Sequence, residues 1–352
     1  MIESLAMSPE SRLRVAVVGC GPIGALHAAA VELSPLARLV SVCDVDERRA
    51  IDLARRLGPD VAPSVRIEEV LERDSIDVVS VATPDHLHVE VVLAAIERGC
   101  HVFCEKPLAT SVDDARLLVV AAATRGVILG VDHNRRFGFG YRTARRLVDE
   151  GRVGPLHCMV FHVVDRTPRP EVVRTPEVIL TTLLTHHLDL ARWFGGDVRL
   201  ISCRFGPRDP GAGNLRRSVV LSLEFQGGAL GSIVATYRDG QTRTFERAEI
   251  VGSLGSVQVD DVTRSAVFRG TDADRLEVFE PSPFTNEAAF LTTIGDHLRA
   301  FLARVSAAEP PPVSGLDGLR GLELVEAARR SHRENRVLLL AEASHPQETS
   351  KS

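Results

Sequence analysis

The sequence predicts two domains: an α/β domain built on a parallel sheet, and an α+β domain with a large, open, mostly antiparallel sheet. A length of 352 residues fits about two domains. Short β-branched runs alternate with helical patterns through about residue 135, which is typical of a parallel sheet with right-handed crossovers. Strand-like segments then follow one another with few helices between them, which favours antiparallel pairing.

The composition excludes several classes of protein. Hydrophobic residues make up 44% and charged residues 25%, as in ordinary globular proteins. No apolar run approaches the roughly 20 residues of a membrane span, and a net charge of −5 gives no bulk electrostatic case for nucleic acid. The start, MIESLAMSPESRL, lacks the basic region and apolar core of a secretory signal, so we expect a cytoplasmic protein. Reduced thiols are then expected at Cys20, Cys43, Cys100, Cys104, Cys158 and Cys203.

A glycine-rich turn follows the first predicted strand in RVAVVGCGPIGALHA, residues 14–28. It has the pattern G-x-G-x-x-G between a strand and a helix. Gly19 permits the tight turn, Gly21 lets the backbone approach a pyrophosphate, and Gly24 lets the helix pack closely on the strand. The helix begins at Pro22 and Ile23, where free N–H groups attract phosphate. These features predict a dinucleotide-binding Rossmann domain.

The second predicted strand, ARLVSVCD, ends at Asp44, 20 residues after Gly24. A carboxylate at this spacing reaches the adenosine ribose hydroxyls and repels a 2′-phosphate, so NAD is favoured over NADP. Arg48 and Arg49 follow closely, and their positive charges weaken the preference for NAD over NADP. NADP therefore remains the alternative cofactor. We place Val45 and Arg49 in the same cofactor site. The competing interpretation of Asp44 is an ordinary turn residue.

Later predicted strands end at Thr83-Pro84, at Glu105-Lys106 and at Asn134. Because ligands bind at the carboxyl ends of parallel strands, these residues should converge with Gly19 and Asp44 on one crevice. Lys106 is one of only two lysines, the other being Lys351. An ammonium is a compact charge that donates three hydrogen bonds and tunes its pKa, so a chemical role is favoured over a solvated surface lysine.

The segments GCGPIG, Asp44, ATPDHLH, EKPLA and NRRF, in this order, resemble the Gfo/Idh/MocA family of oxidoreductases. The resemblance implies a cis peptide before the proline that follows Lys106, and places Lys106 near both nicotinamide and substrate. It also implies cofactor contacts from Thr83, Pro84, His88 and Glu105. Asn134 is assigned to both cofactor and substrate, and Arg135 to the substrate.

Residues 177–196, EVILTTLLTHHLDLARWFGG, predict a helix with a broad apolar face. In the resembling family this helix carries the catalytic histidine, preceded by an aspartate one turn earlier, where this chain has Thr182. Threonine supplies no charge, so the relay should be weaker. Either His186 works with Lys106, or His187 or Asp189 contributes, or the reaction is not the standard one. Successive helical residues lie about 100° apart, so one histidine should be in the core, and we favour His186 as catalytic.

Further substrate contacts are assigned to Thr182, His186, His187 and Asp165. Asp165 and Arg166 lie in VVDRTPRP, residues 163–170, for which a solvated loop is the alternative. No H-E-x-x-H motif and no Cys/His ligand spacing occurs, so no metal is predicted.

The predicted function is an NAD(P)-dependent oxidoreductase acting on a sugar, a cyclitol or a related keto or hydroxy compound. Thr182 favours ketone reduction as the working direction. Two alternatives remain: a catalytically silent cofactor-bound regulator or scaffold, and redox-neutral NAD-assisted glycoside cleavage. The partner is a small polyol or keto-sugar, and the open sheet predicts a homodimer or homotetramer.

The predicted boundaries are a tail at 1–12, the Rossmann domain at 13–135, a substrate-binding and oligomerisation domain at 136–340, and a tail at 341–352. Two helices are expected late in the chain, near 286–306 and 317–335. The second should return to the sheet or pack back on the first domain.

Overall fold

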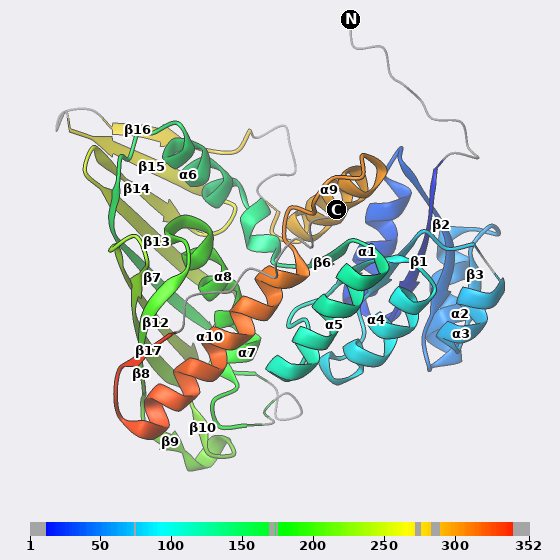
Figure 1. Ribbon diagram of the computed structural model, residues 1–352, viewed down its shortest axis with the longest axis horizontal. Helices are drawn as coiled ribbons and strands as arrows, with labels where there is room; N and C mark the ends of the chain where they lie inside the picture. The colour runs from blue at the N-terminus through cyan, green and yellow to red at the C-terminus, as the bar shows by residue number, and fades with distance from the viewer. Residues whose placement is uncertain are drawn as a thin grey trace, which may run out of the picture. The chain divides into compact units, whose positions relative to one another are not determined.

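The computed structural model describes residues 12–73, 75–168, 173, 175–271, 276–282 and 289–340 (Figure 1). The chain divides into two compact units, residues 1–139 with 281–323 and residues 140–280 with 324–352. The tails expected at the two ends lie, apart from residue 12, outside the described residues.

A six-stranded, wholly parallel sheet forms the centre of the first unit, in the order β3-β2-β1-β4-β5-β6. Its alternate residues feed two cores, since Ala16 and Val18 pack in one apolar cluster and Val15 and Val17 in another. Both faces are therefore covered, which explains the continuous apolar runs. The predicted Rossmann fold is confirmed. The strands are β1 (Leu13–Val18), β2 (Ala37–Cys43), β3 (Ala62–Ser64), β4 (Val78–Val81), β5 (His101–Cys104) and β6 (Leu129–Val131).

Two of the helices between these strands begin at residues whose side chains cap them. The Asp46 side chain caps α2 by accepting from the N–H groups of Arg48 and Arg49, and Ser111 caps α5 through Asp114 N–H. The first unit contains α1 (Pro22–Glu32), α2 (Glu47–Leu57), α3 (Ile67–Arg73), α4 (His88–Glu97) and α5 (Val112–Arg125).

Two expectations for this unit were wrong. The strand predicted to end at Asn134 is only β6, which ends at Val131 and is followed by a 3₁₀ helix, η3 (Asn134–Phe137). The late helix, α9 (Thr292–Ser306), belongs to the first unit and not to the second. Its residues Leu298, Phe301 and Leu302 join the core cluster of Val15 and Val17. An amphipathic pattern predicts a buried face but not the core that receives it.

The second unit is built on a nine-stranded sheet in the order β16-β15-β14-β13-β7-β12-β11-β8-β17. β7 and β12 pair in parallel, and the other neighbours are antiparallel, which confirms the mostly antiparallel prediction. The strands are β7 (Leu156–Arg166), β8 (Val198–Phe205), β11 (Ser218–Phe225), β12 (Leu230–Arg238), β13 (Phe245–Gly252), β14 (Gly255–Asp260), β15 (Ser265–Gly270), β16 (Leu276–Phe279) and β17 (Leu338–Leu339); β9 (Arg208–Asp209) and β10 (Leu215–Arg216) form a separate pair.

Helices cover one face of this sheet, as Figure 1 shows. α6 (Phe139–Asp149) contributes Tyr141, Ala144 and Leu147 to the core of the unit, together with Phe161 and Ile233 of the sheet. Alternating side chains on the same strands are exposed instead, namely Val160, Val220 and Val234.

The helix predicted over 177–196 is two helices, α7 (Ile179–Thr182) and α8 (Leu184–Gly195). The break falls at Leu183, whose φ and ψ are −115° and −52°. The last helix, α10 (Gly315–Glu334), contains the division between the units, because its first part joins the first core and its later part the second.

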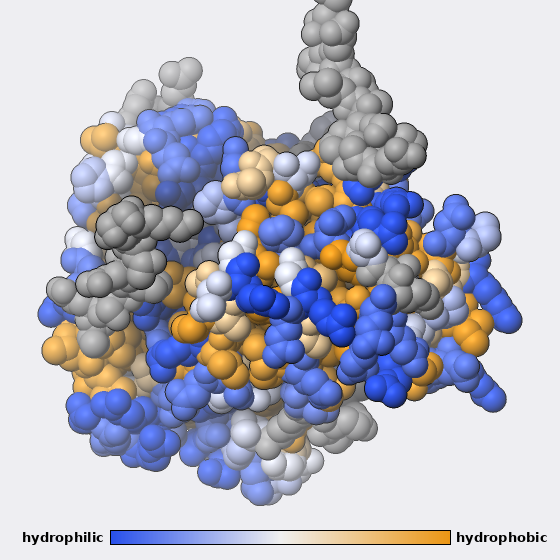
Figure 2. All heavy atoms as spheres, turned by 45° about the vertical axis from the view of Figure 1, so that its right-hand side comes forward, coloured by the Kyte–Doolittle hydropathy of each residue, from blue (hydrophilic) through white to orange (hydrophobic). Residues whose placement is uncertain are grey.

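Apolar and charged side chains alternate over the face in Figure 2, as a mixed composition predicts. Within the described part of the chain, no helix has a stretch of apolar residues that would cross a bilayer.

Candidate functional site

The glycine turn has the geometry that its sequence predicts. Gly19 has a φ of +99°, which favours glycine. A Cβ on Gly24 would lie 1.7 Å from the Gly19 carbonyl oxygen, so helix and turn touch through backbone alone. A Cβ on Gly21 would meet nothing within 4 Å, so space is open beside that backbone. No side chain caps the N-terminus of α1 at Gly21, which leaves this end of the helix to a ligand or solvent.

The Asp44 carboxylate is held by two backbone donors. Its Oδ2 accepts from Cys20 N–H at 2.7 Å, and its Oδ1 from Asp46 N–H at 2.9 Å. Asp44 thus ties the end of β2 to the glycine turn. Each carboxylate oxygen has a second lone pair, so the group retains capacity to accept from a ribose hydroxyl.

A cavity of about 470 Å³ lies along this edge of the sheet. It contains seven of the predicted cofactor residues: Gly19, Gly21, Asp44, Val45, Arg49, Thr83 and Pro84. Its apolar walls include Ile67, Leu87 and Val91, which were not predicted because single apolar residues on helices give no binding signal. The open Gly21 backbone, the uncapped helix and the oriented carboxylate fit a dinucleotide.

His88 does not lie as the sequence suggested. It is 1% exposed, and its Nδ1 and Nε2 face the carbonyl oxygens of Pro107 and Thr83 at 2.8 and 3.0 Å. Both ring nitrogens are therefore turned toward the protein, which leaves none for a cofactor. The role the geometry supports is to hold the loop after β4 against the loop after β5.

Glu105 and Lys106 follow β5 directly, and the peptide between Lys106 and Pro107 is cis. Lys106 is half-buried, and its own N–H donates to Glu105 Oε2 at 3.2 Å. Burial lowers the pKa of the Lys106 ammonium, although the Glu105 charge opposes this shift. A lysine with a lowered pKa at the carboxyl edge of a Rossmann sheet is suited to holding a substrate oxygen.

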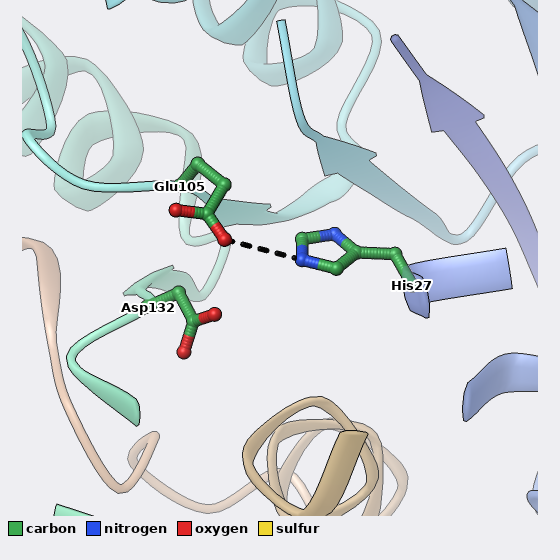
Figure 3. A group of neighbouring side chains, drawn as sticks. All are labelled: His27, Glu105 and Asp132. Carbon is green, nitrogen blue, oxygen red and sulfur yellow. Dashed lines mark ion pairs between the residues drawn. The ribbon is translucent and has the colours of Figure 1, made fainter. Parts of the chain in front are cut away.

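Behind Lys106 lies a buried group of titratable side chains, drawn in Figure 3. His27 from α1 points its Nε2 at Glu105 Oε1, 3.4 Å away (Figure 3). Asp132, which follows β6, lies beside these two side chains. His297 of α9 meets Asp132 Oδ1 through its Nδ1 at 2.7 Å. Of these four, only Glu105 was predicted.

Burial and the neighbouring Glu105 charge raise the pKa of Asp132 well above its usual range. Burial alone would raise the pKa of Glu105, but the hydrogen bond and charge of His27 outweigh it and lower that pKa. Burial lowers the pKa of His297 well below its usual range. Three of these side chains, His27, Glu105 and Asp132, bring one oxygen or nitrogen each within 4.8 Å of one another.

Asn134 and Arg135 are both buried in η3. The Asn134 amide donates to Thr293 Oγ1 of α9 at 2.8 Å, and the Arg135 guanidinium lies 5.7 Å from the centre of the Phe290 ring. Arg135 also contributes to lowering the pKa of Lys106. Asn134 thus connects η3 to α9.

In the second unit the two adjacent histidines have different surroundings. His187 is fully buried, with Nε2 3.2 Å from Glu246 Oε1, and Tyr141 donates to the same oxygen at 2.6 Å. Its ring also meets Phe161 edge-on. His187 is thus the core histidine, and its assignment as a substrate contact was wrong. His186 is 5% exposed.

Thr182 hydrogen-bonds a residue that the sequence reasoning missed. Its hydroxyl donates to the Val178 carbonyl at 2.9 Å and so accepts from Tyr237 O–H at 2.5 Å. Burial raises the pKa of Tyr237 to about 12. Tyr237 pairs with Asp165 across β12 and β7, and the Asp165 carboxylate accepts from Thr244 Oγ1 at 2.9 Å. A tyrosine on a strand carries no motif, so only the sheet register brings it to Thr182.

Comparison with known proteins agrees with this geometry. Residues 13–133 match the model of an oxidoreductase family with an NAD-binding Rossmann fold, and residues 141–258 match the GFO/IDH/MocA C-terminal domain. The chain is 30% identical to a myo-inositol 2-dehydrogenase of Thermotoga maritima, covering 94% of this chain and 99% of that protein. It is also 30% identical to a 1,5-anhydro-D-fructose reductase of Ensifer adhaerens, covering 87% and 91%.

A crystal structure of a probable dehydrogenase from Thermotoga maritima superimposes with a TM-score of 0.81 at 29% identity, covering 93% of this chain and 98% of that one. The predicted family resemblance is confirmed over nearly the whole chain. With its NAD-binding Rossmann unit and its mostly antiparallel second unit, this chain belongs to the Gfo/Idh/MocA family of NAD-binding oxidoreductases.

Proposed function

We propose that this oxidoreductase exchanges hydride between nicotinamide and a carbinol or carbonyl carbon of a cyclitol or sugar. Two relatives that match nearly the whole chain are named for an inositol and for an anhydro-sugar. The observation that carries the proposal is Lys106, the only lysine among the first 350 residues, half-buried at the carboxyl end of β5.

The residues that would hold NAD lie along the same edge of the sheet. The turn and first helical residues would hold the pyrophosphate, since Gly21 offers open backbone beside the uncapped N-terminus of α1. These residues are Gly19, Gly21, Pro22, Ile23 and Gly24. Asp44, Val45 and Arg49 would surround the adenosine ribose, and Thr83 and Pro84 would line the path toward Lys106. When bound, NAD supplies the hydride acceptor or donor. The Asp44 carboxylate favours NAD over NADP, because a 2′-phosphate would be repelled.

The protein supplies charge and a proton to the reacting oxygen. The Lys106 ammonium holds that oxygen and stabilises the negative charge that develops on it. The proton is assigned to His186, because its neighbour His187 is engaged with Glu246 in the core. Thr182 and Asp165 remain candidate substrate contacts, as do Asn134 and Arg135, and Glu105 acts through Lys106.

The chain provides a matched pair of variants for a test, because it has only two lysines. Purified protein is assayed with NAD and a panel of inositols and sugars, and with NADH and the corresponding ketones. We expect turnover of at least one compound. Lys106→Met should lower kcat by about 10²- to 10³-fold, the usual loss for one donor to a developing oxyanion, and Lys351→Met should leave it unchanged.

Two results would contradict the proposal. Full activity of Lys106→Met would remove the lysine from the reaction. Release of sugar from a glycoside without net NADH formation would indicate the redox-neutral cleavage instead.

The exposed face of the nine-stranded sheet is the proposed surface for a homodimer or homotetramer. Val160, Val220 and Val234 are each more than a third exposed on three neighbouring strands. Burial of such a face between copies would remove apolar area from water. Sedimentation of the wild type and of Val234→Glu, which should dissociate the oligomer, tests this assignment.

A further inference from the structure

The three side chains drawn in Figure 3 come from distant parts of the first unit and point toward one another. His27 lies on α1, Glu105 directly follows β5, and Asp132 directly follows β6. One ring nitrogen or carboxylate oxygen of each lies within 4.8 Å of the other two. His27 and Glu105 are 78 residues apart in the chain, so a search for closely spaced ligand motifs does not find this group.

His27 directs a ring nitrogen without a hydrogen bond into this group. Its Nδ1 lies 2.8 Å from Ser80 Oγ, and its Nε2 faces Glu105 Oε1 at 3.4 Å. That separation exceeds the roughly 2.7–3.2 Å of an N–H···O hydrogen bond, and Nε2 has no hydrogen-bond partner within the described part of the chain. His27 is completely buried, so this nitrogen is shielded from bulk water. When Nδ1–H donates to Ser80, Nε2 carries a lone pair, which is the atom by which imidazole binds metals.

The two acids are arranged in the same way as His27. Glu105 Oε2 accepts the Lys106 backbone N–H at 3.2 Å, and its Oε1 is the oxygen that faces His27. Asp132 Oδ1 meets His297 Nδ1 at 2.7 Å, which leaves its second oxygen for another partner. Figure 3 shows one Asp132 oxygen turned toward the other two side chains and one turned away. Each member of the group is thus oriented through one atom and presents a second atom to its neighbours.

This set of donor atoms fits a divalent metal cation. One imidazole nitrogen and two carboxylate oxygens are ligands of Zn²⁺ and Mn²⁺, with Zn²⁺ bonds of about 2.0–2.2 Å. At those bond lengths the ligand atoms lie about 3–4 Å apart, so small movements of the side chains close the group around a cation. Buried carboxylates are stable when they are paired or bind a metal, and two of them match the charge of a divalent cation.

The surroundings of the group also fit a metal site. Histidine and carboxylate ligands are usually held by a further hydrogen bond, and Ser80 and His297 provide one each. A metal site also needs a path of entry. The Glu105 side chain is 15% exposed, whereas His27 and Asp132 are buried, so a cation would enter past Glu105.

We propose that His27 Nε2, one oxygen of Glu105 and one oxygen of Asp132 bind a divalent cation of the Zn²⁺ or Mn²⁺ class. Ser80 and His297 orient two of these ligands. The site joins α1 to the ends of β5 and β6 within the first unit. It does not depend on the proposed hydride transfer, because binding of a cation requires no substrate. The nitrogen ligand favours these cations over Mg²⁺ and Ca²⁺, which prefer oxygen ligands.

Calorimetric titration of metal-free, untagged protein with ZnCl₂ and with MnCl₂ tests the site. We expect one cation per chain with at least one of these salts, and weaker binding of MgCl₂ and CaCl₂. His27→Gln should abolish binding because it removes the nitrogen ligand, and Asp132→Asn because it removes a charge. His86→Gln is the matched control and should bind as the wild type does, since His86 also lies 3.7 Å from an acid, Asp85, but is exposed and outside the group.

A graded loss is expected from Ser80→Ala. This change removes the hydroxyl next to His27 Nδ1 but no ligand atom. The affinity for the cation should fall by about 10- to 100-fold, the usual effect of losing such a partner, and the stoichiometry should stay at one. An affinity equal to that of the wild type would show that Ser80 does not orient the ligand, and would overturn that part of the proposal.

Three other results would overturn the site itself. The first is no one-to-one binding of either Zn²⁺ or Mn²⁺ by the wild type, the second is unchanged binding in His27→Gln, and the third is binding of Mg²⁺ as tight as that of both. Should His27→Gln not fold, electron spin-echo spectra of the wild type loaded with Mn²⁺ decide the matter. Coupling to one imidazole nitrogen is expected, and its absence overturns the proposal. Failure of the proposed function appears separately, as full turnover by Lys106→Met.

Discussion

Each unit buries a histidine against a carboxylate, and the two groups are built differently. In the second unit one acid, Glu246, receives Tyr141 O–H and faces His187 Nε2. In the first unit two acids, Glu105 and Asp132, lie together between two histidines and next to Lys106. The group with one acid lies in the core of the second unit, where Tyr141 is part of the apolar cluster. In the group with two acids, the Glu105 charge raises the pKa of Lys106, so we expect its loss to affect the lysine more than the fold.

The largest effect is expected from removing the acid of the second unit. Glu246→Leu removes the acceptor of the Tyr141 hydroxyl and the carboxylate that faces His187 Nε2 in the core. We expect the free energy of unfolding to fall by about 3–5 kcal/mol, the usual result of breaking a buried pair. Urea denaturation measures it. Glu246→Gln, which keeps an acceptor, is the control, and equal losses in the two variants would show that hydrogen bonding is not the cause.

A smaller loss is expected from Tyr141→Phe. This change removes one donor to Glu246 while His187 remains, and a hydrogen bond to a charged group contributes about 1.5–3 kcal/mol. Because Tyr141 and Glu246 are buried in the second unit and are not assigned to the reaction, we expect kcat of the folded variant to equal that of the wild type. A lower kcat with unchanged stability would contradict the assignment of Tyr141 and Glu246 to the core alone.

The first group should appear in the pH dependence of activity. In the proposed reaction the ammonium of Lys106 is the active form, and burial lowers its pKa. Activity is therefore complete below that pKa and is lost as the pH rises through it, about tenfold in kcat/KM per pH unit. This alkaline limb should begin at lower pH than the 10.5 of an ordinary lysine. Glu246→Gln should leave the limb in place, and a shift there would show that the second group also acts on Lys106.

The smallest effect concerns stability at mildly acidic pH. Because burial keeps His297 neutral, its pKa is lower in the folded than in the unfolded chain. Its contribution is present above its ordinary pKa of 6.5 and is lost as the pH falls toward the folded value. In His297→Asn, whose amide can still donate to Asp132, the free energy of unfolding should fall less between neutral pH and pH 5. An identical slope in wild type and variant would argue against a neutral His297.

The parts of the molecule that follow from local sequence were predictable. Gly19, Gly24 and Asp44 act within one turn and two strand ends, so their spacing alone indicated their roles. The buried cluster was not, because His27 and Glu105 lie 78 residues apart and His297 belongs to a helix assigned to the wrong unit. One signal was available: His27 interrupts an apolar helix face that includes Ala28, Ala30 and Val31. A buried imidazole there requires a polar partner from elsewhere in the chain.

Two further features could not be predicted from the sequence: the break at Leu183 and the contact between Thr182 and Tyr237. A continuous apolar pattern over 177–196 favours one helix, and nothing in it indicates the change of direction. The contact depends on the register of β12 beside β7, which is set by the whole sheet. Local patterns therefore predicted the residues at the carboxyl edge of the parallel sheet. The buried cluster and the Thr182–Tyr237 contact depend on pairing between distant parts of the chain, which local patterns do not contain.

The scarcity of lysine has a practical consequence for proteolysis. A lysine-specific endoproteinase has two candidate sites in the chain, one directly before Pro107 and one a single residue from the C-terminus. The first bond precedes a proline, which lacks the amide hydrogen and constrains the backbone. Such an enzyme should leave even the unfolded chain almost intact. An arginine-specific enzyme meets 40 arginines, of which Arg169 directly precedes a proline, and should cut the chain readily once it opens. Cleavage by the arginine-specific enzyme therefore reports opening of the fold, and the lysine-specific enzyme serves as a control that leaves the chain almost uncut.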